Sequence, residues 1–151
     1  MSKLESPDEI QVLGAIRAAF AFLEREHGYR EESSHYDKES FGNAAVDYRS
    51  AQLRIGVIKD RGQFFTTFAA ARAGSFFDEQ VVLQFLGAAD EAERLVKLRW
   101  ESLELQADVV RRHLARIEAA FSPEHYERTA QELTRLKHAR AEALFGPSAR
   151  P

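Results

Sequence analysis

The segment Ile55–Ala69 constrains the fold more than any other part of this chain, because it predicts a β-hairpin with apolar residues on both faces. Its two halves alternate apolar and polar residues, as strands do, around the turn sequence Lys59-Asp60-Arg61-Gly62-Gln63. A type I turn followed by Gly62 in the left-handed region would make a three-residue loop with a bulge. In that register Lys59 would face Gln63.

This register divides the apolar side chains of the hairpin between two faces. One face would carry Leu53, Ile55, Val57, Phe65 and Ala69, and the other would carry Ile58, Phe64 and Phe68. A slip of one residue would exchange Phe65 for Phe64 and Phe68, so either register leaves a large apolar side chain off the main face. That second face must be covered by the rest of the chain or by another molecule. Packing within the chain is the usual fate of such side chains.

The chain before the hairpin predicts one helix and two further strands. Ser6-Pro7-Asp8-Glu9 is a helix-start signal, with Ser at the N-cap, Pro at the first helical position and Glu at N3. Apolar residues then recur every three or four positions up to His27, and Gly28 is expected to end the helix. Residues 29–36 predict a weakly alternating strand, and residues 44–49 predict a half-buried one.

A short helix and a long helical hairpin are expected after the sheet. Asp78 is the predicted N-cap of the short helix, which would end at Gly87. From residue 88, apolar residues in a heptad pattern predict a single helix of about 30 residues that ends at Phe121. Ser122-Pro123 would start a last helix of about 22 residues. Because their connection is short, the last two helices should be antiparallel neighbours.

These elements predict an α+β fold, in which an N-terminal helix packs on a roughly four-stranded antiparallel meander, followed by a short helix and a long C-terminal antiparallel helical hairpin. Residues 1–87 would form the sheet domain and residues 88–151 the hairpin packed on it, and we expect both to fold as one unit. The 151 residues, 44% of them hydrophobic, suit a globular chain. Without a signal-peptide core or a membrane-length apolar run, we expect a cytoplasmic protein with no membrane contact.

No catalytic, cofactor or metal motif stands out in the sequence. The chain has no cysteine, which excludes disulfides, thiolate zinc sites and cysteine nucleophiles. It also lacks a glycine-rich phosphate loop and a nucleophile elbow. Glu24/His27 and Glu32/His35 match part of a di-iron motif, but solvated side chains explain them better, because the second pair falls in a predicted strand or loop. We expect no cofactor and no enzymatic activity, with a scattered active site as an alternative.

The net charge of −3 is unevenly placed, because the whole acidic excess lies in residues 1–87. Acidic residues gather where the first helix meets the first strand. They would either steer a basic protein partner or simply form polar loop surface. Basic residues form spots on the last two predicted helices, where acidic residues are equally numerous. A solvated surface explains these spots better than phosphate contacts do, so nucleic acid is not an expected partner.

The order of the elements carries a family resemblance. The chain resembles a broad group of small bacterial α+β proteins. The resemblance lies in the order of a helix, Gly-Tyr, a polar strand, the sequence VDYRSAQLRIGVIKDRGQFF and then FFDEQVVLQFLG. Some members of this group resemble the immunity proteins that accompany polymorphic toxins. The resemblance covers about residues 8–87 and implies a protein that occludes a partner protein. It transfers no functional residues.

Three functional hypotheses follow from the sequence. The first is a non-enzymatic, immunity-like protein-binding module that uses its sheet and acidic edge, with the candidate residues Glu31, Glu32, Asp37, Glu39, Phe64 and Phe68. The second is a self-assembling structural or regulatory dimer that uses the heptad helix, with the candidate residues Val96, Trp100, Leu103 and Val110. The third is a small-ligand binder or an enzyme with a pocket between sheet and helices.

Overall fold

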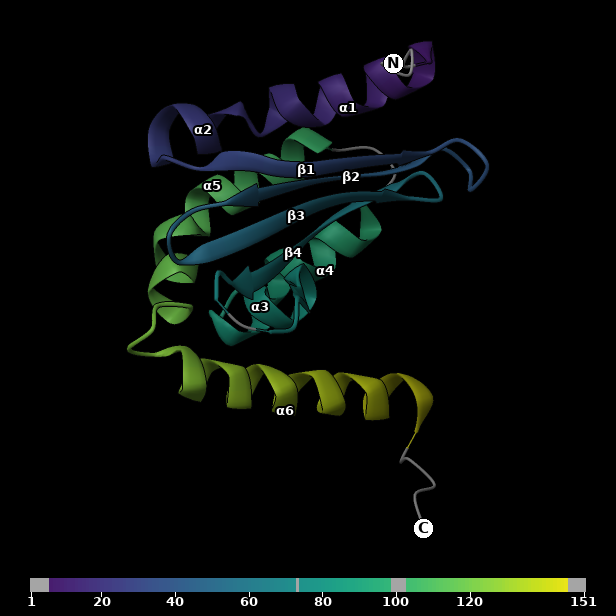
Figure 1. Ribbon diagram of the computed structural model, residues 1–151. Helices are drawn as coiled ribbons and strands as arrows, with labels where there is room; N and C mark the ends of the chain where they lie inside the picture. The colour runs from purple at the N-terminus through teal and green to yellow at the C-terminus, as the bar shows by residue number, and fades with distance from the viewer. Residues whose placement is uncertain (1–5, 73, 99–102, 147–151) are drawn as a thin grey trace.

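The computed structural model describes residues 6–72, 74–98 and 103–146, and it confirms the α+β class (Figure 1). The first four elements are α1 (Pro7–Ala19), α2 (Ala21–His27), β1 (Arg30–Asp37) and β2 (Asn43–Arg49). They are followed by β3 (Leu53–Asp60), β4 (Gln63–Ala70), β5 (Phe77–Asp78), α3 (Glu79–Phe85), α4 (Ala89–Lys97), α5 (Leu103–Ala120) and α6 (Tyr126–Phe145). None of the helices in these described ranges is both long and apolar enough to cross a membrane.

The predicted first helix is two helices, although its predicted ends are confirmed. The Glu9 backbone N–H donates to the Ser6 side chain at 3.2 Å, which caps α1, and Gly28 ends α2 at a φ of 73°. Between the two helices Phe20 leaves helical geometry, with φ −103° and ψ 14°. On one straight helix Phe20 and Phe22 would lie about 200° apart. The break lets both rings enter the core, with their centroids 5.9 Å apart.

The sheet is an antiparallel meander in the order β1-β2-β3-β4-β5. Its first face carries the core side chains, and α1 and α5 pack on that face, as Figure 1 shows. The buried residues of this face on the three central strands are Ala44, Val46, Tyr48, Leu53, Ile55, Val57, Thr66, Phe68 and Ala70. The strict alternation of burial along β2 follows from the two-residue period of a strand.

The predicted register of the β3–β4 hairpin is wrong by one residue. Asp60 pairs with Gln63 and Lys59 pairs with Phe64, so the loop has two residues rather than three. Arg61 and Gly62 form this loop with φ of 53° and 84°, the double positive φ that two-residue hairpins of the I′ type require.

The slip changes which phenylalanines share a face. Phe64 and Phe68 lie on the first face, where Phe68 is 2% exposed and Phe64 packs against the core. Phe65 pairs with Ile58 and lies on the second face. The helices on the first face explain the outcome, because this register buries two aromatic rings against them instead of one.

The predicted single helix between residue 88 and Phe121 is also wrong. Helix α4 ends at Lys97 and α5 begins at Leu103, and Trp100 lies outside the described residues. The two helices pack on different partners, since α4 packs mainly on α3 and α5 contacts β4 and α1.

The last helix is long, as predicted, but its packing partner is different. Helix α6 begins at Tyr126 rather than at the predicted Pro123, and no side chain caps it. It packs mainly on α3 instead of along α5, and Figure 1 shows it crossing below α3. Residues Leu133 and Leu136 make this contact with the core.

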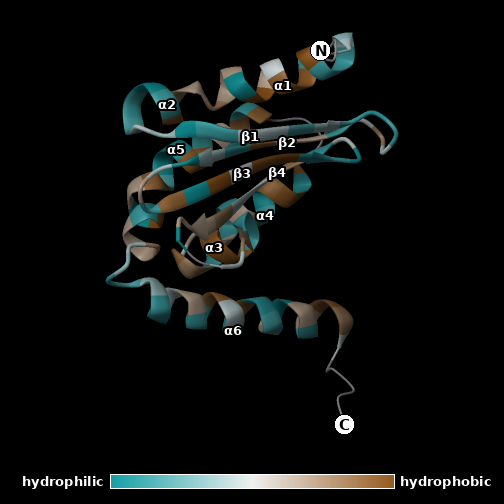
Figure 2. Ribbon diagram, in the orientation of Figure 1, coloured by the Kyte–Doolittle hydropathy of each residue, from teal (hydrophilic) through white to brown (hydrophobic). Residues whose placement is uncertain are grey.

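One hydrophobic core joins the sheet to the helices that follow it. Ile16, Ile55, Leu114 and Leu133 all belong to the same cluster of buried residues and are at most 1% exposed. A smaller cluster joins α3, α4 and α5 and contains Leu95. Figure 2 shows the hydrophobic colours concentrated on β3 and α3, whereas α6 mixes both colours along its length.

Candidate functional site

The second face of the sheet carries an apolar band at its centre. Ala45 of β2 pairs with Ile58 of β3, and Ile58 pairs with Phe65 of β4, so the three side chains form one row across the strands. Each of them is half-buried. The helices α1, α3 and α5 contact the sheet from the opposite face, and the three side chains of this row each keep part of their surface exposed.

A polar row lies directly beside the apolar band. Asp47, Gly56 and Thr67 are neighbours across β2, β3 and β4. A side chain at Gly56 would begin 2.7 Å from Thr67 Oγ1 and 3.1 Å from Asp47 Oδ1. The Thr67 hydroxyl and the Asp47 carboxylate therefore occupy the space beside Gly56 where a larger side chain would lie. Ser33 Oγ also donates to Asp47 Oδ2 at 2.8 Å, which holds this carboxylate in place.

Two arginines lie on the second face at the end opposite to the β3–β4 turn. Arg49 and Arg54 are paired across β2 and β3. Arg49 Nη2 donates to the carbonyl of Ala71 at 2.6 Å, and Arg54 donates to the carbonyls of Ala70 and Gly74 at 3.1 and 3.2 Å. Both guanidinium groups therefore tie the segment after β4 to the sheet.

The predicted acidic edge is largely paired with arginine. Arg17 holds both carboxylate oxygens of Glu31, at 2.8 and 3.0 Å. Arg49 lies 3.1 Å from Glu32. Because these charges are compensated, the acidic cluster offers less attraction to a basic partner than the sequence indicates.

The other two predicted acidic residues lie in the turn after β1. Asp37 Oδ1 accepts the backbone N–H groups of Glu39 and Ser40, at 3.0 and 3.2 Å. Hydrogen bonding from Ser40 lowers the pKa of Asp37 below its ordinary value. The Asp37 carboxylate therefore organises the turn, and Glu39 is exposed.

The predicted apolar contact residues lie mostly inside the protein. Phe64 and Phe68 are on the covered face of β4, three strands away from the acidic residues of β1, so the structure does not bring the two sets together. Leu103 and Val110 are 6% and 2% exposed and belong to the core. Val96 is 44% exposed on α4, separate from them. Side chains that are already buried offer no surface to a second chain.

A buried carboxylate that the sequence did not single out joins three elements under the first face. Glu79 is 1% exposed, and its Oε2 accepts from the backbone N–H and the hydroxyl of Thr66, at 3.1 and 3.0 Å. Gln106 of α5 donates to Glu79 Oε1 at 3.4 Å and to the carbonyl of Phe64 at 3.1 Å. Glu79 looks like an ordinary first-turn acid in the sequence, and only the packing of α5 reveals its role.

The described residues contain no group of three His, Asp or Glu side chains that could hold a metal ion. The two Glu-x-x-His pairs do not converge, because the first lies at the end of α2 and the second on β1. The His27 ring packs edge-on against Phe22, with 6.2 Å between ring centroids.

No family model, curated protein or solved structure matches this chain.

Proposed function

We propose that this chain is a non-enzymatic protein-binding module that occludes a partner protein with the second face of its sheet. The observation that carries the proposal is the apolar row of Ala45, Ile58 and Phe65 at the centre of the face opposite to the helices. The exposed faces of antiparallel sheets are ordinarily polar. An apolar row in the middle of such a face is what a protein interface needs at its own centre.

The surroundings of the apolar row support the same function. Protein interfaces combine an apolar centre with a polar rim. Here Asp47 and Thr67 lie on one side of the row, and the row continues to His35 of β1. The strands hold these side chains in a fixed arrangement, so little conformational entropy would be lost when a partner binds.

The resemblance to immunity proteins suggests a partner class, a bacterial toxin domain that the sheet would occlude. Since Glu31 and Glu32 are paired with arginines, apolar contact rather than long-range attraction would supply the affinity. We therefore expect the affinity to depend only weakly on ionic strength. The absence of cysteine agrees with a reducing compartment, and we propose a cytoplasmic location.

Capture experiments with a matched pair of variants test this function. Ile58→Asp places a charge in the apolar row, whereas Ile10→Asp places one on α1, where Ile10 is already 56% exposed. The wild type and Ile10→Asp should retain one partner during purification from the native host, and Ile58→Asp should lose it. Circular dichroism would show that both variants fold. If a folded Ile58→Asp protein kept the partner, the second face would not be the binding surface.

A self-assembling dimer is the second candidate function, and a separate observation favours it. Leu144 and Phe145 at the end of α6 are 69% and 86% exposed, so this helix end presents two large apolar side chains to solvent. Light scattering during size-exclusion chromatography, over a range of concentrations, tests this candidate. A dimer that dissociates in the Leu144→Ser/Phe145→Ser variant would support it, and a monomer at all concentrations would remove it.

A further inference from the structure

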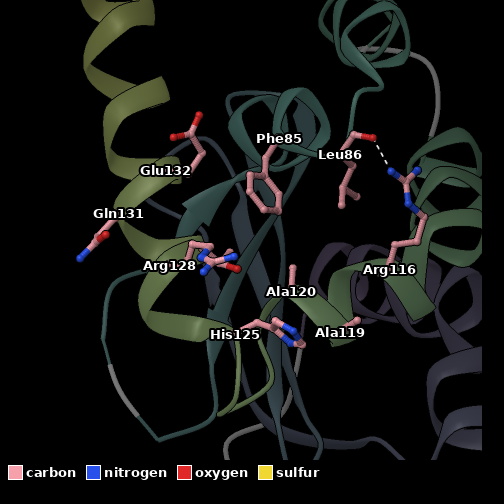
Figure 3. Close-up of a pocket in the computed structure, with 10 residues that line it drawn as sticks. Phe85, Leu86, Arg116, Ala119, Ala120, His125, Arg128, Gln131 and Glu132 are labelled. Carbon is pink, nitrogen blue, oxygen red and sulfur yellow. Dashed lines mark hydrogen bonds between the residues drawn. The ribbon is translucent and has the colours of Figure 1, made fainter.

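A groove of about 620 Å³ opens between the end of α3, the end of α5 and the start of α6 (Figure 3). Its apolar lining consists of Phe85, Leu86, Ala119 and Ala120. Figure 3 shows the Phe85 ring and Ala120 on facing sides of the groove. Small-molecule sites commonly have volumes of about 300–1,000 Å³ and are lined mainly by apolar side chains with a few polar groups. The groove has such a volume, and most of its exposed lining surface is apolar. Its polar lining residues are Arg116, His125, Arg128, Thr129, Gln131 and Glu132.

Two arginines lie on different sides of this groove. Arg116 comes from α5, and its guanidinium donates to the carbonyl oxygen of Leu86, as the dashed line in Figure 3 shows. Arg128 comes from the first turn of α6. It makes no ion pair or hydrogen bond with any residue in the described part of the chain. One guanidinium is thus held in position by the protein, and the other is available to a ligand.

The acid that lines the groove does not cancel this positive charge. Glu132 is bound to Arg135, whose Nε donates to both carboxylate oxygens at 3.2 and 3.0 Å. Hydrogen bonding from Arg135 also holds the pKa of Glu132 below its ordinary value. Glu124 and Glu127 line an adjacent depression, which shares Arg128 with the groove. The groove itself therefore combines an apolar floor with two cationic groups.

We propose that this groove binds a small aliphatic carboxylic acid. The alkyl chain would lie on the apolar floor formed by Phe85, Leu86, Ala119 and Ala120, and Arg128 would bind the carboxylate. A guanidinium matches a carboxylate through two parallel hydrogen bonds, which makes this pairing strong and selective. Arg116 adds a second positive charge nearby. A polyanion would fit less well, because most of the exposed surface of the lining is apolar.

Isothermal titration calorimetry with three probes tests the proposal on the full chain. Decanoate supplies both parts of the ligand, decanol supplies the alkyl chain alone, and acetate supplies the carboxylate alone. We expect decanoate to bind at one site per chain and decanol to bind at least about tenfold more weakly, because it lacks the charged hydrogen bonds. Acetate should give no measurable binding. Equal binding of decanoate and decanol, or no binding of decanoate below its micellar concentration, would overturn the proposal.

Two arginine variants locate the site. Arg128→Gln should weaken decanoate binding about tenfold and leave decanol binding unchanged, because only the charged contact is lost. Arg140→Gln is the matched control, since Arg140 lies more than three turns further along α6 and outside the groove. Unchanged decanoate affinity in Arg128→Gln would rule out this site. A peptide with an apolar C-terminal residue that bound more tightly than decanoate would reassign the groove to a peptide carboxylate.

Discussion

The phenol of Tyr29 donates a hydrogen bond of 2.8 Å to the Glu118 carboxylate, although the two residues lie 89 positions apart. Tyr29 is 3% exposed and directly precedes β1, and Glu118 lies near the end of α5. Arg111, also on α5, approaches the same region, with its guanidinium 4.5 Å from the centre of the Phe22 ring. Polar and cation–π contacts thus join α5 to the beginning of the sheet.

Tyr29→Phe should lower the free energy of unfolding by about 1–3 kcal/mol, because it removes a partly buried hydrogen bond to a charged group. The ring itself stays, so packing is preserved. Urea denaturation with wild type and variant would measure the difference. A change below about 0.5 kcal/mol would mean that water replaces the phenol at Glu118 without loss.

Tyr48→Phe is the matched comparison, and it should have the opposite or no effect. The Tyr48 hydroxyl is buried without a hydrogen-bond partner among the described residues, and the ring stacks on Phe20 with 6.5 Å between centroids. Removing an unsatisfied hydroxyl while keeping the ring should leave the free energy of unfolding unchanged or raise it by up to about 1 kcal/mol. The same urea experiment measures it, and a clear loss of stability would reveal a partner for the hydroxyl.

The two buried phenols predict how stability depends on alkaline pH. Burial raises the pKa of both Tyr29 and Tyr48 above the ordinary value of 10.0, and the Glu118 hydrogen bond adds to the rise for Tyr29. Above about pH 10 the unfolded chain therefore loses these protons while the folded chain keeps them. The free energy of unfolding should be unaffected by these groups below that pH and fall as the pH rises above it.

Urea midpoints between pH 8 and pH 11 would check this dependence. The Tyr29→Phe/Tyr48→Phe double variant should show a smaller fall than wild type, because it lacks both titrating groups. An equal fall in the two proteins would assign the effect to other residues.

The two-residue turn predicts opposite effects at adjacent positions. Gly62→Ala should lower the free energy of unfolding by about 1–2 kcal/mol, because a φ of 84° is unfavourable for a residue with a side chain. Arg61→Asn should stabilise the protein by about 0.5 kcal/mol, because Asn tolerates a φ of 53° better than Arg. Thermal unfolding of both variants measures these effects. If Gly62→Ala had no effect, the loop would not adopt this geometry in solution.

The buried Glu79 predicts a large effect from a single substitution. Glu79→Ala should lower the free energy of unfolding by about 3 kcal/mol or more, because the Thr66 N–H and hydroxyl would lose their acceptor inside the protein. Gln106 would keep only its hydrogen bond to the Phe64 carbonyl. Glu93→Ala on α4 is the control, since Glu93 is exposed. Urea denaturation should separate the two variants clearly. Similar stabilities would show that water reaches the Glu79 site.

Features that depend on neighbouring residues were predictable from the sequence. The N-caps at Ser6 and Asp78 and the left-handed Gly28 are all present. These caps join residues three to five positions apart, so a short stretch of sequence is enough to predict them. The same holds for the alternation of buried and half-buried residues along β2, which this strand displays by itself.

Features that depend on distant packing were not predictable. The turn Asp60-Arg61-Gly62 fits both a two-residue and a three-residue loop, and the choice between them moves every following side chain to the other face. Similarly, an unbroken heptad pattern does not show that α4 and α5 pack on different partners.

The candidate sites show the same division. The sequence by itself determined the α+β class, the caps at Ser6, Gly28 and Asp78, and the presence of surplus apolar residues in the hairpin. It did not show the breaks between α1 and α2 or between α4 and α5. Only the tertiary structure decided that Phe65 and Ile58 lie on the second face, and that α3, α5 and α6 enclose a groove between residues as distant as Phe85 and Arg128. The physical reason is that local conformation depends on neighbouring residues, whereas burial and charge pairing depend on residues far apart in the chain, which only the folded core brings together.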